Sequence, residues 1–328
     1  MTEPGGSETT GTQGLPADAV LSGDLPTAVL AEARRELPGD VTAYHDALMA
    51  AADAHDPIRM DHLVHGWSVA RDVLDADTDE EHRAWAVLDR RLGQVLFGEG
   101  LPAAADVLVA AIAHASASGD TVEELRCRLA FVPVEVAVGD ATALDSGAGY
   151  VEQLLALEEY SHAAGGLMGL AHVVPDDDAA SMLLRASHLY ERAGDGGWAA
   201  EAAVIAARAM TTTGDARLAD TLQRAHQLVE AHPTVELRIS LAEIQALLAW
   251  QGGDPASAAA VLRAAIEAAA RTGRPVPPGL QVMLCDLLVE TGELDQLREP
   301  ASALVEVGQL LGDDELTSMG ERYLALVP

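Results

Sequence analysis

The densest group of residues that could do chemistry lies in the stretch AHDPIRMDHLVH, residues 54–65. His62 and His65 stand three apart, so in a helix they would share one face and could present two imidazoles to a metal ion. His55, Asp56 and Asp61 lie nearby. A closed metal site needs further ligands and hydrogen-bonded support, which nothing adjacent supplies. We favour ordinary surface or half-buried histidines here and keep a metal-binding or enzymatic His55–His65 site as the alternative.

Other reactive side chains give weaker signals. His162 and His172 flank the glycine-rich run HAAGGLMGLAH, where they could face a pocket or simply bond to backbone carbonyls. Cys127 and Cys285 are far apart in sequence and have no metal or redox spacing, which predicts two buried thiols in a reducing compartment. The sequence contains no nucleophile elbow, phosphate-binding loop or zinc-protease motif. We therefore expect a protein that is not an enzyme and needs no cofactor.

The charge balance restricts the partners. The formal net charge is −32, from 52 acidic residues against 20 basic ones, and every basic residue is arginine. Such a chain should not bind nucleic acid or an anionic membrane, although it could attract a basic protein. The absence of lysine and asparagine indicates codon bias in a GC-rich genome, with salt adaptation as the alternative.

Composition also indicates the fold class. Apolar residues make up 49% of the chain but aromatic residues only 3%, so the core must consist mainly of Ala, Leu and Val. Closely packed helices suit such a core better than a β-sandwich does. The start, MTEPGGSETTGTQG, has neither the basic nor the apolar part of a signal peptide, and no run reaches about 18 apolar residues. We expect a soluble, cytoplasmic protein.

Turn residues recur at a nearly constant spacing. One series of markers is separated by 39, 36, 39, 39 and 39 residues, and a second series falls near the middle of these intervals. The first series is Gly100, Gly139, Pro175, Gly214, Gly253 and Gly292; the second is Gly119, Gly194, Pro233, Gly273 and Gly312. Segments of about 15–18 residues with helical apolar spacing fill the gaps. Periodic helix pairs of this kind predict an α-solenoid.

The segment WQGGDPASAAAVLRAAIEAAARTG, residues 250–273, shows the local logic. Gly253 can take the left-handed conformation that ends a helix, Asp254 can cap the next helix, and Pro255 fits its first position. Thr78 with Glu81, and Thr121 with Glu124, have the spacing of a capping box. Pro133 should kink the helix expected over 121–138.

These units resemble the tetratricopeptide repeat. The resemblance rests on LGQVLFGEGLPAAADVLVAAI (92–112), ALLAWQGGDPASAAAVLRAA (246–265) and LCDLLVETGEL (284–294), with their Leu-Gly, turn-glycine and small-alanine positions. The period near 39 exceeds the family's value of about 34, and most of the family's aromatic positions are lost. The repeat unit of this chain looks like the longer-helix relatives of the family found in bacterial regulators and adaptors. The resemblance implies an all-α, right-handed superhelix of stacked antiparallel helix pairs.

The expected organisation has four parts. Residues 1–20 form a disordered tail, 21–77 N-terminal capping helices, 78–312 the repeats, and 313–328 a C-terminal capping helix. No hairpin in such an array can bury both of its apolar faces alone, so each needs its neighbour.

The resemblance also implies a site, because the first helix of each pair lines the inner surface of such a superhelix. Carried over to the positions before each hairpin marker, it selects Arg90, Gln94, Phe97, Arg126, Leu129, His162, His172, Glu201 and Arg208. The arginines could bind a carboxylate such as a peptide C-terminus, or could pair with acids of neighbouring repeats. Ile239, Ala242 and Ala246 would form a small, apolar inner face.

The function expected from the sequence is therefore a non-enzymatic scaffold that binds a protein or peptide segment in a concave groove. The first alternative is a ligand- or peptide-sensing regulator that acts through a separate output protein. The second is the metal-binding or enzymatic protein built on the histidine cluster, and a purely structural oligomer also stays open.

Overall fold

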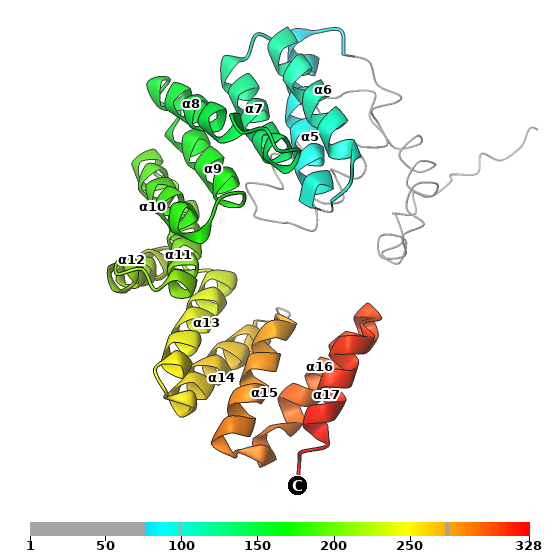
Figure 1. Ribbon diagram of the computed structural model, residues 1–328, viewed down its shortest axis with the longest axis vertical. Coiled ribbons are helices and arrows are strands. Elements are labelled where there is room, and N and C mark those ends of the chain that lie inside the picture. The colour runs from blue at the N-terminus through cyan, green and yellow to red at the C-terminus, as the bar shows by residue number, and fades with distance from the viewer. Residues whose placement is uncertain (1–75, 99, 273–275) are drawn as a thin grey trace, which may run out of the picture. The chain divides into compact units, whose positions relative to one another are not determined.

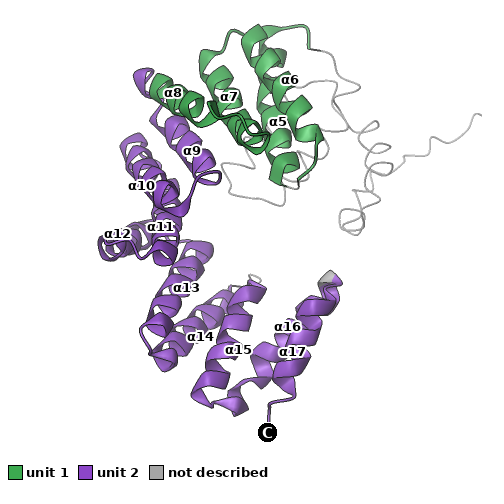
Figure 2. Ribbon diagram, viewed as in Figure 1, with its two compact units in different colours: residues 1–154 green, residues 155–328 purple. Residues whose placement is uncertain are grey.

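The computed structural model describes residues 76–98, 100–272 and 276–328, and throughout these ranges the regular secondary structure is helical, with no β-strand. The chain, whose helices are labelled in Figure 1, divides into two compact units, residues 1–154 and 155–328 (Figure 2). The all-α fold of stacked helix pairs predicted from the sequence is confirmed. The division into two units was not predicted.

The described helices follow one another with short turns. The first unit contains α5 (Asp79–Gly98), α6 (Ala103–Ala117), α7 (Thr121–Ala137) and most of α8 (Ala143–Ala156). The second contains α9 (Tyr160–Ala171), α10 (Asp176–Ala193), α11 (Gly196–Thr213), α12 (Leu218–Ala231), α13 (Val235–Gln251), α14 (Pro255–Arg271), α15 (Pro278–Thr291), the short 3₁₀ helix η1 (Leu294–Gln296), α16 (Arg298–Leu311) and α17 (Asp314–Leu324). In the first unit α5 packs on α6 and α6 on α7, and in the second unit successive helices from α9 to α17 pack together. In addition, α5 contacts α7, and α11 contacts α13.

Glycine turns set the helix boundaries at the predicted positions. Eight of the nine glycine markers have positive φ, and the ninth, Gly273, lies outside the described residues. At Gly194, φ is 87° and the N–H donates to the carbonyl of Glu191, while the N–H of Asp195 reaches back to Tyr190. Only glycine takes this left-handed conformation without steric cost, so it can end a helix abruptly. The spacing of these glycines therefore limits the length of the helices that end at them.

The N-terminal caps confirm two of three predictions. The N–H of Ser257 donates to the carboxylate of Asp254 at 3.0 Å, ahead of Pro255 in the first helical position. A capping box also joins Thr78 and Glu81.

The third predicted cap, a capping box between Thr121 and Glu124, was wrong. Asp120 caps α7 instead, by accepting from the N–H of Glu123 at 3.0 Å. An aspartate one residue earlier is as good a cap as threonine and leaves Thr121 inside the helix. Pro133 lies within α7, which stays helical from Thr121 to Ala137.

Small side chains dominate the core. In α11, residues 199, 200, 202, 203, 206 and 207 are all alanines with no exposed surface, because this helix is packed on several sides. Cys127 and Cys285 are free thiols with 0% exposure, as the sequence predicted. Alanine cores let helix axes approach closely, and they leave little side-chain volume where helices diverge.

Polar contacts join helices that are one repeat apart in the second unit. They are Arg208 to Glu243 (α11 to α13, 2.5 Å), Trp250 to Glu290 (α13 to α15, 2.7 Å) and Tyr323 to Asp286 (α17 to α15, 2.5 Å). The partners are 35, 40 and 37 residues apart, close to the spacing of the turn markers. The sequence period is therefore also the period of contacts between the helices.

The final helix, α17, packs on α16 through two glycines. A Cβ at Gly320 would lie 2.9 Å from the carbonyl oxygen of Ala301 and 2.9 Å from the amide nitrogen of Val305. A Cβ at Gly308 would likewise lie 2.6 Å from the amide nitrogen of Thr317. Backbone atoms cannot move aside cheaply, so both positions require glycine.

We predict that Gly320→Ala lowers the free energy of unfolding by about 1–3 kcal/mol, because the added methyl forces α17 away from α16. The matched control is Gly279→Ala at the start of α15, where a Cβ meets nothing within 4 Å. The control should be neutral or slightly stabilising, since alanine favours helices. Urea unfolding followed by circular dichroism measures both variants. Equal effects at the two positions would contradict the close packing of α17.

Candidate functional site

Two of the arginines predicted to line a groove meet inside the first unit. Arg90 on α5 donates from Nε to Glu123 Oε1 at 2.7 Å, and Arg126 on α7 donates from Nη1 to Glu123 Oε2 at 2.6 Å. The side chains of Arg90 and Glu123 are each only 4% exposed, while that of Arg126 is 23% exposed. The carboxylate therefore holds α5 and α7 together and occupies both arginines.

The electrostatics of this cluster follow from burial and from charge. Burial alone would lower the pKa of Arg90, but the carboxylate of Glu123 outweighs it and the pKa lies above its ordinary value. Burial, reinforced by repulsion from Arg90, lowers the pKa of Arg126 to about 10. Burial and the neighbouring Glu123 raise the pKa of Cys127, so this thiol stays protonated. At neutral pH both arginines are charged and Cys127 is not a nucleophile.

The predicted site residues of the second unit are distributed over α9 and α11. Arg208 on α11 is paired with Glu243, with the arginine side chain 51% exposed. His162 Nδ1 lies 2.9 Å from a carboxylate oxygen of Glu159, and His172 is exposed at the C-terminal end of α9. Glu201 is a half-buried residue of α11.

The three arginines follow the alternative in which each pairs with an acid of the same chain. The structure brings Arg90 and Arg126 together on one glutamate and places Arg208 on another in the other unit. Of the apolar candidates, Leu129 is buried in α7, and Phe97 is half-buried on α5. Gln94 is exposed on α5. Binding by these residues stays a prediction.

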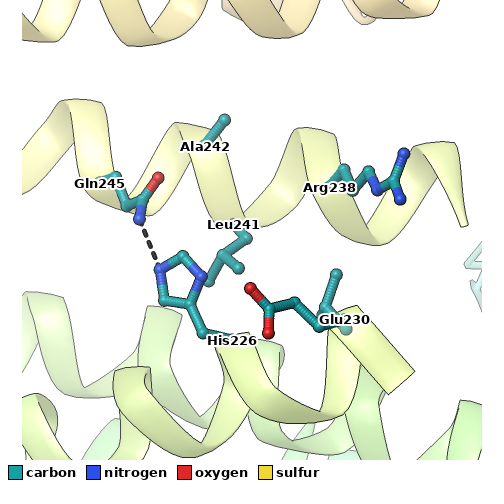
Figure 3. Close-up of a pocket in the computed structure, with 7 residues that line it drawn as sticks. His226, Glu230, Arg238, Leu241, Ala242 and Gln245 are labelled. Atoms are coloured by element: carbon teal, nitrogen blue, oxygen red, sulfur yellow. Dashed lines mark hydrogen bonds between the residues drawn. The ribbon is translucent and has the colours of Figure 1, made fainter. Parts of the chain in front are cut away.

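A hollow between α12 and α13 gives a more open candidate site. Its volume is about 200 Å³, and it is lined by His226, Val229, Glu230, Arg238, Leu241, Ala242 and Gln245. Figure 3 shows His226 and Glu230 on α12 facing α13, with Leu241 between the helices. The amide of Gln245 and Nε2 of His226 lie 2.5 Å apart and close one side.

A second hollow of about 340 Å³ lies between α13 and α14. Apolar side chains dominate its lining, which consists of Val235, Ile239, Ala242, Val261, Ala264, Ala265, Ala268 and Ala269 together with Arg238, Gln245 and Thr272. Arg238, Ala242 and Gln245 line both hollows. One face of α13 therefore carries a continuous candidate surface with an apolar part and a polar part.

Arg238 differs from the arginines chosen from the sequence. It is exposed on α13, and its guanidinium forms no hydrogen bond or ion pair with a described residue. Glu230, across the first hollow, is likewise exposed and has no described partner. Free charges beside apolar surface are what recognition of a polar, partly apolar segment requires.

Sequence reasoning named part of this surface and missed the rest. Ile239 and Ala242 were expected on a small, apolar inner face, and both line the α13–α14 hollow, whereas Ala246 is buried. Arg238 was missed because the positions were carried over from the hairpin marker alone. The available signal was an arginine directly before Ile239, on the same predicted helix as the small residues Ala242 and Ala246.

The described residues carry no group of three or more His, Cys, Asp or Glu side chains able to hold a metal ion. The His55–His65 cluster lies outside the described residues. A search of the described helices for a membrane-crossing segment finds none of sufficient length and apolarity.

Comparison with known proteins gives no family. No family model and no curated protein matches the chain. Among solved structures, a circular tandem repeat protein with novel repeat topology and enhanced subunit contact surfaces shares 15% identity, with a TM-score of 0.25 over 93% of this chain and 84% of that one. Ton1535 from Thermococcus onnurineus NA1 shares 13% identity, with a TM-score of 0.30 over 91% and 94% of the two chains. Neither superposes closely, so the helix pairs themselves carry the fold assignment.

We predict that Glu123→Gln lowers the free energy of unfolding by about 3 kcal/mol, because it leaves the buried Arg90 without a counter-charge. The matched control is Glu124→Gln, one residue on, whose partner Arg128 is 39% exposed. That surface pair should contribute less than about 1 kcal/mol. Urea unfolding of the two variants at pH 7 measures the difference. Similar losses for both would show that burial of the Glu123 pair is not what stabilises the contact.

Proposed function

We propose that this protein is a non-enzymatic scaffold that binds a protein segment on the α12–α14 surface, defined as the residues lining the two hollows. The proposal is supported most by one observation: Arg238 has no described partner and lies where a polar and an apolar hollow meet. A helical-repeat fold is well suited to such a role, because its helix faces form extended surfaces.

The lining residues indicate how such a segment would be held. The α13–α14 hollow has room for an apolar side chain against Val235, Ile239 and Val261. A carboxylate of the segment would pair with the guanidinium of Arg238, whose planar fork matches that group. Apolar contacts would supply the affinity, and the charged contact would set the orientation.

The net charge of −32 adds a long-range term to this binding. It would speed the approach of a partner that is basic overall and slow that of an acidic one. The segment fitting both features carries its carboxylate locally, for example at a chain terminus, within an otherwise neutral or basic protein.

We predict that Ala242→Trp abolishes capture of the partner, because an indole at this shared position fills both hollows. Affinity capture from the native cells, followed by quantitative mass spectrometry, should recover a partner with the wild type. The amount of this partner recovered with the variant should be at least about tenfold lower. The matched control is Ala219→Trp, an exposed alanine of α12 outside the lining. It should capture as the wild type does.

A second pair tests the charged contact. Arg238→Glu should weaken capture, whereas Arg298→Glu, the same charge change at an exposed residue of α16, should not. Circular dichroism confirms that each variant is folded. If every captured protein binds Ala242→Trp and Arg238→Glu as well as it binds the wild type, the α12–α14 surface is not the binding site.

A further inference from the structure

Two histidines of the first unit lie in direct contact through their rings. His82 on α5 and His114 on α6 have their Nδ1 atoms 2.9 Å apart, and both side chains are half-buried. The indole ring of Trp85 lies against His114, with ring centroids 4.7 Å apart. The contact joins the first turns of α5 to the last turn of α6, so it connects the two helices of one hairpin.

The short separation fixes how many protons lie between the rings. With no proton on either Nδ1, two lone pairs would face each other and repel. With one proton, the two nitrogens form an N–H···N hydrogen bond of ordinary length. With two protons, both N–H groups and two positive charges would point at each other. The observed contact therefore belongs to the one-proton state.

The ring orientation favours a hydrogen bond over a shared metal ion. The ring centroids lie 5.1 Å apart, close to the 2.9 Å between the nitrogens plus the two ring radii. The two nitrogens therefore lie nearly on the line that joins the ring centres. Imidazoles that bind one metal point at a common third position off that line.

The surroundings select which ring carries the proton. His114 lies in the last turn of α6, where the helix dipole favours positive charge, and His82 lies at the end of the first turn of α5, where the dipole disfavours it. Nearby charges are Glu81 beside His82 on α5, and the ion pair of Arg83 with Asp120, which caps α7. On α6, the acid is Asp106, in its first turn. His114 is therefore the donor and His82 the acceptor.

We infer that His82 and His114 form a one-proton imidazole pair that makes the packing of α5 on α6 depend on pH. A single added proton strengthens the bond, since a charged N–H donates better than a neutral one. A second added proton breaks it and sets two cations against each other, half-buried beside Trp85. The hairpin is therefore tight at neutral pH and loosens when both rings are protonated.

The direction of the pH effect follows from proton counting. In the unfolded chain the two rings are apart, whereas in the folded pair the second added proton sets two cations against each other. Once the first added proton is bound, the unfolded state therefore binds more protons than the folded state, so further acidification favours unfolding. Each proton bound preferentially by the unfolded state changes the unfolding equilibrium by up to about tenfold per pH unit. The effect falls within the range of about pH 5–8 over which histidines titrate.

The test compares the wild type with His114→Asn between pH 7.5 and pH 5. Asparagine keeps one donor and one acceptor near the position of Nδ1 and does not titrate. In the lower part of this range, where the second proton adds, we expect the wild type to lose stability on acidification up to about tenfold per pH unit more steeply than the variant in urea unfolding. The matched control, His172→Asn, removes an exposed histidine with no described partner and should keep the wild-type slope.

Nitrogen NMR of the wild-type imidazoles gives a readout that needs no variant to fold. At pH 7.5 the pair should show ¹⁵N–¹⁵N coupling across the hydrogen bond, which disappears on acidification. Absence of this coupling, or equal pH slopes for the wild type and His114→Asn, overturns the proposal. So does binding of Zn²⁺ or Ni²⁺ by the wild type that His114→Asn abolishes, since that result would make the pair a metal site.

Discussion

The structure depends on helices that have more apolar surface than a single hairpin partner can cover, as α11 does among the described helices. Within each unit the excess is buried against the next pair, as where α11 packs on α10, α12 and α13. This constraint explains why the turn markers are so regular. If one helix were a turn longer, its apolar face would extend past its neighbour and stay in water. The left-handed glycines end many of the described helices before this happens.

The same packing determines which carboxylates the arginines pair with. The chain has 52 acids and 20 arginines, and several described arginines pair with a carboxylate of another helix or of their own. Arg90 and Arg126 share one glutamate, and Arg208 has another. Arginines at the inner positions of this acidic array therefore stabilise the stack of helices. Arg238, which lines both hollows beside Ala242, differs because its guanidinium pairs with no described carboxylate.

How much the sequence could predict depends on the range of each interaction. Glycine markers, the Asp254 cap and the Thr78–Glu81 box are local, and all were predicted, because each acts within a few residues of itself. The cap of α7 was misassigned because Asp120 and Thr121 are adjacent and equally suitable, and only the path of the chain chooses between them.

The His82–His114 contact, the three-residue cluster at Glu123 and the hollows were not predicted. They depend on helix crossing geometry and rotamers, which periodicity does not encode. The direction of a side chain such as Arg238 is set by the same long-range geometry.

The alanine-rich core also explains where the candidate surface lies. Alanine gives close contact in α11, but it is too short to fill a wider space between helices. Between α13 and α14 the facing residues include Ala242, Ala264, Ala265 and Ala268, so the space stays open as a hollow instead of being filled by larger side chains. The neighbouring α16–α17 contact shows the opposite outcome, because glycines at 308 and 320 bring the backbones together and leave no space. In this protein the same use of small side chains therefore produces tight joints and open hollows, and the crossing of each helix pair decides between them.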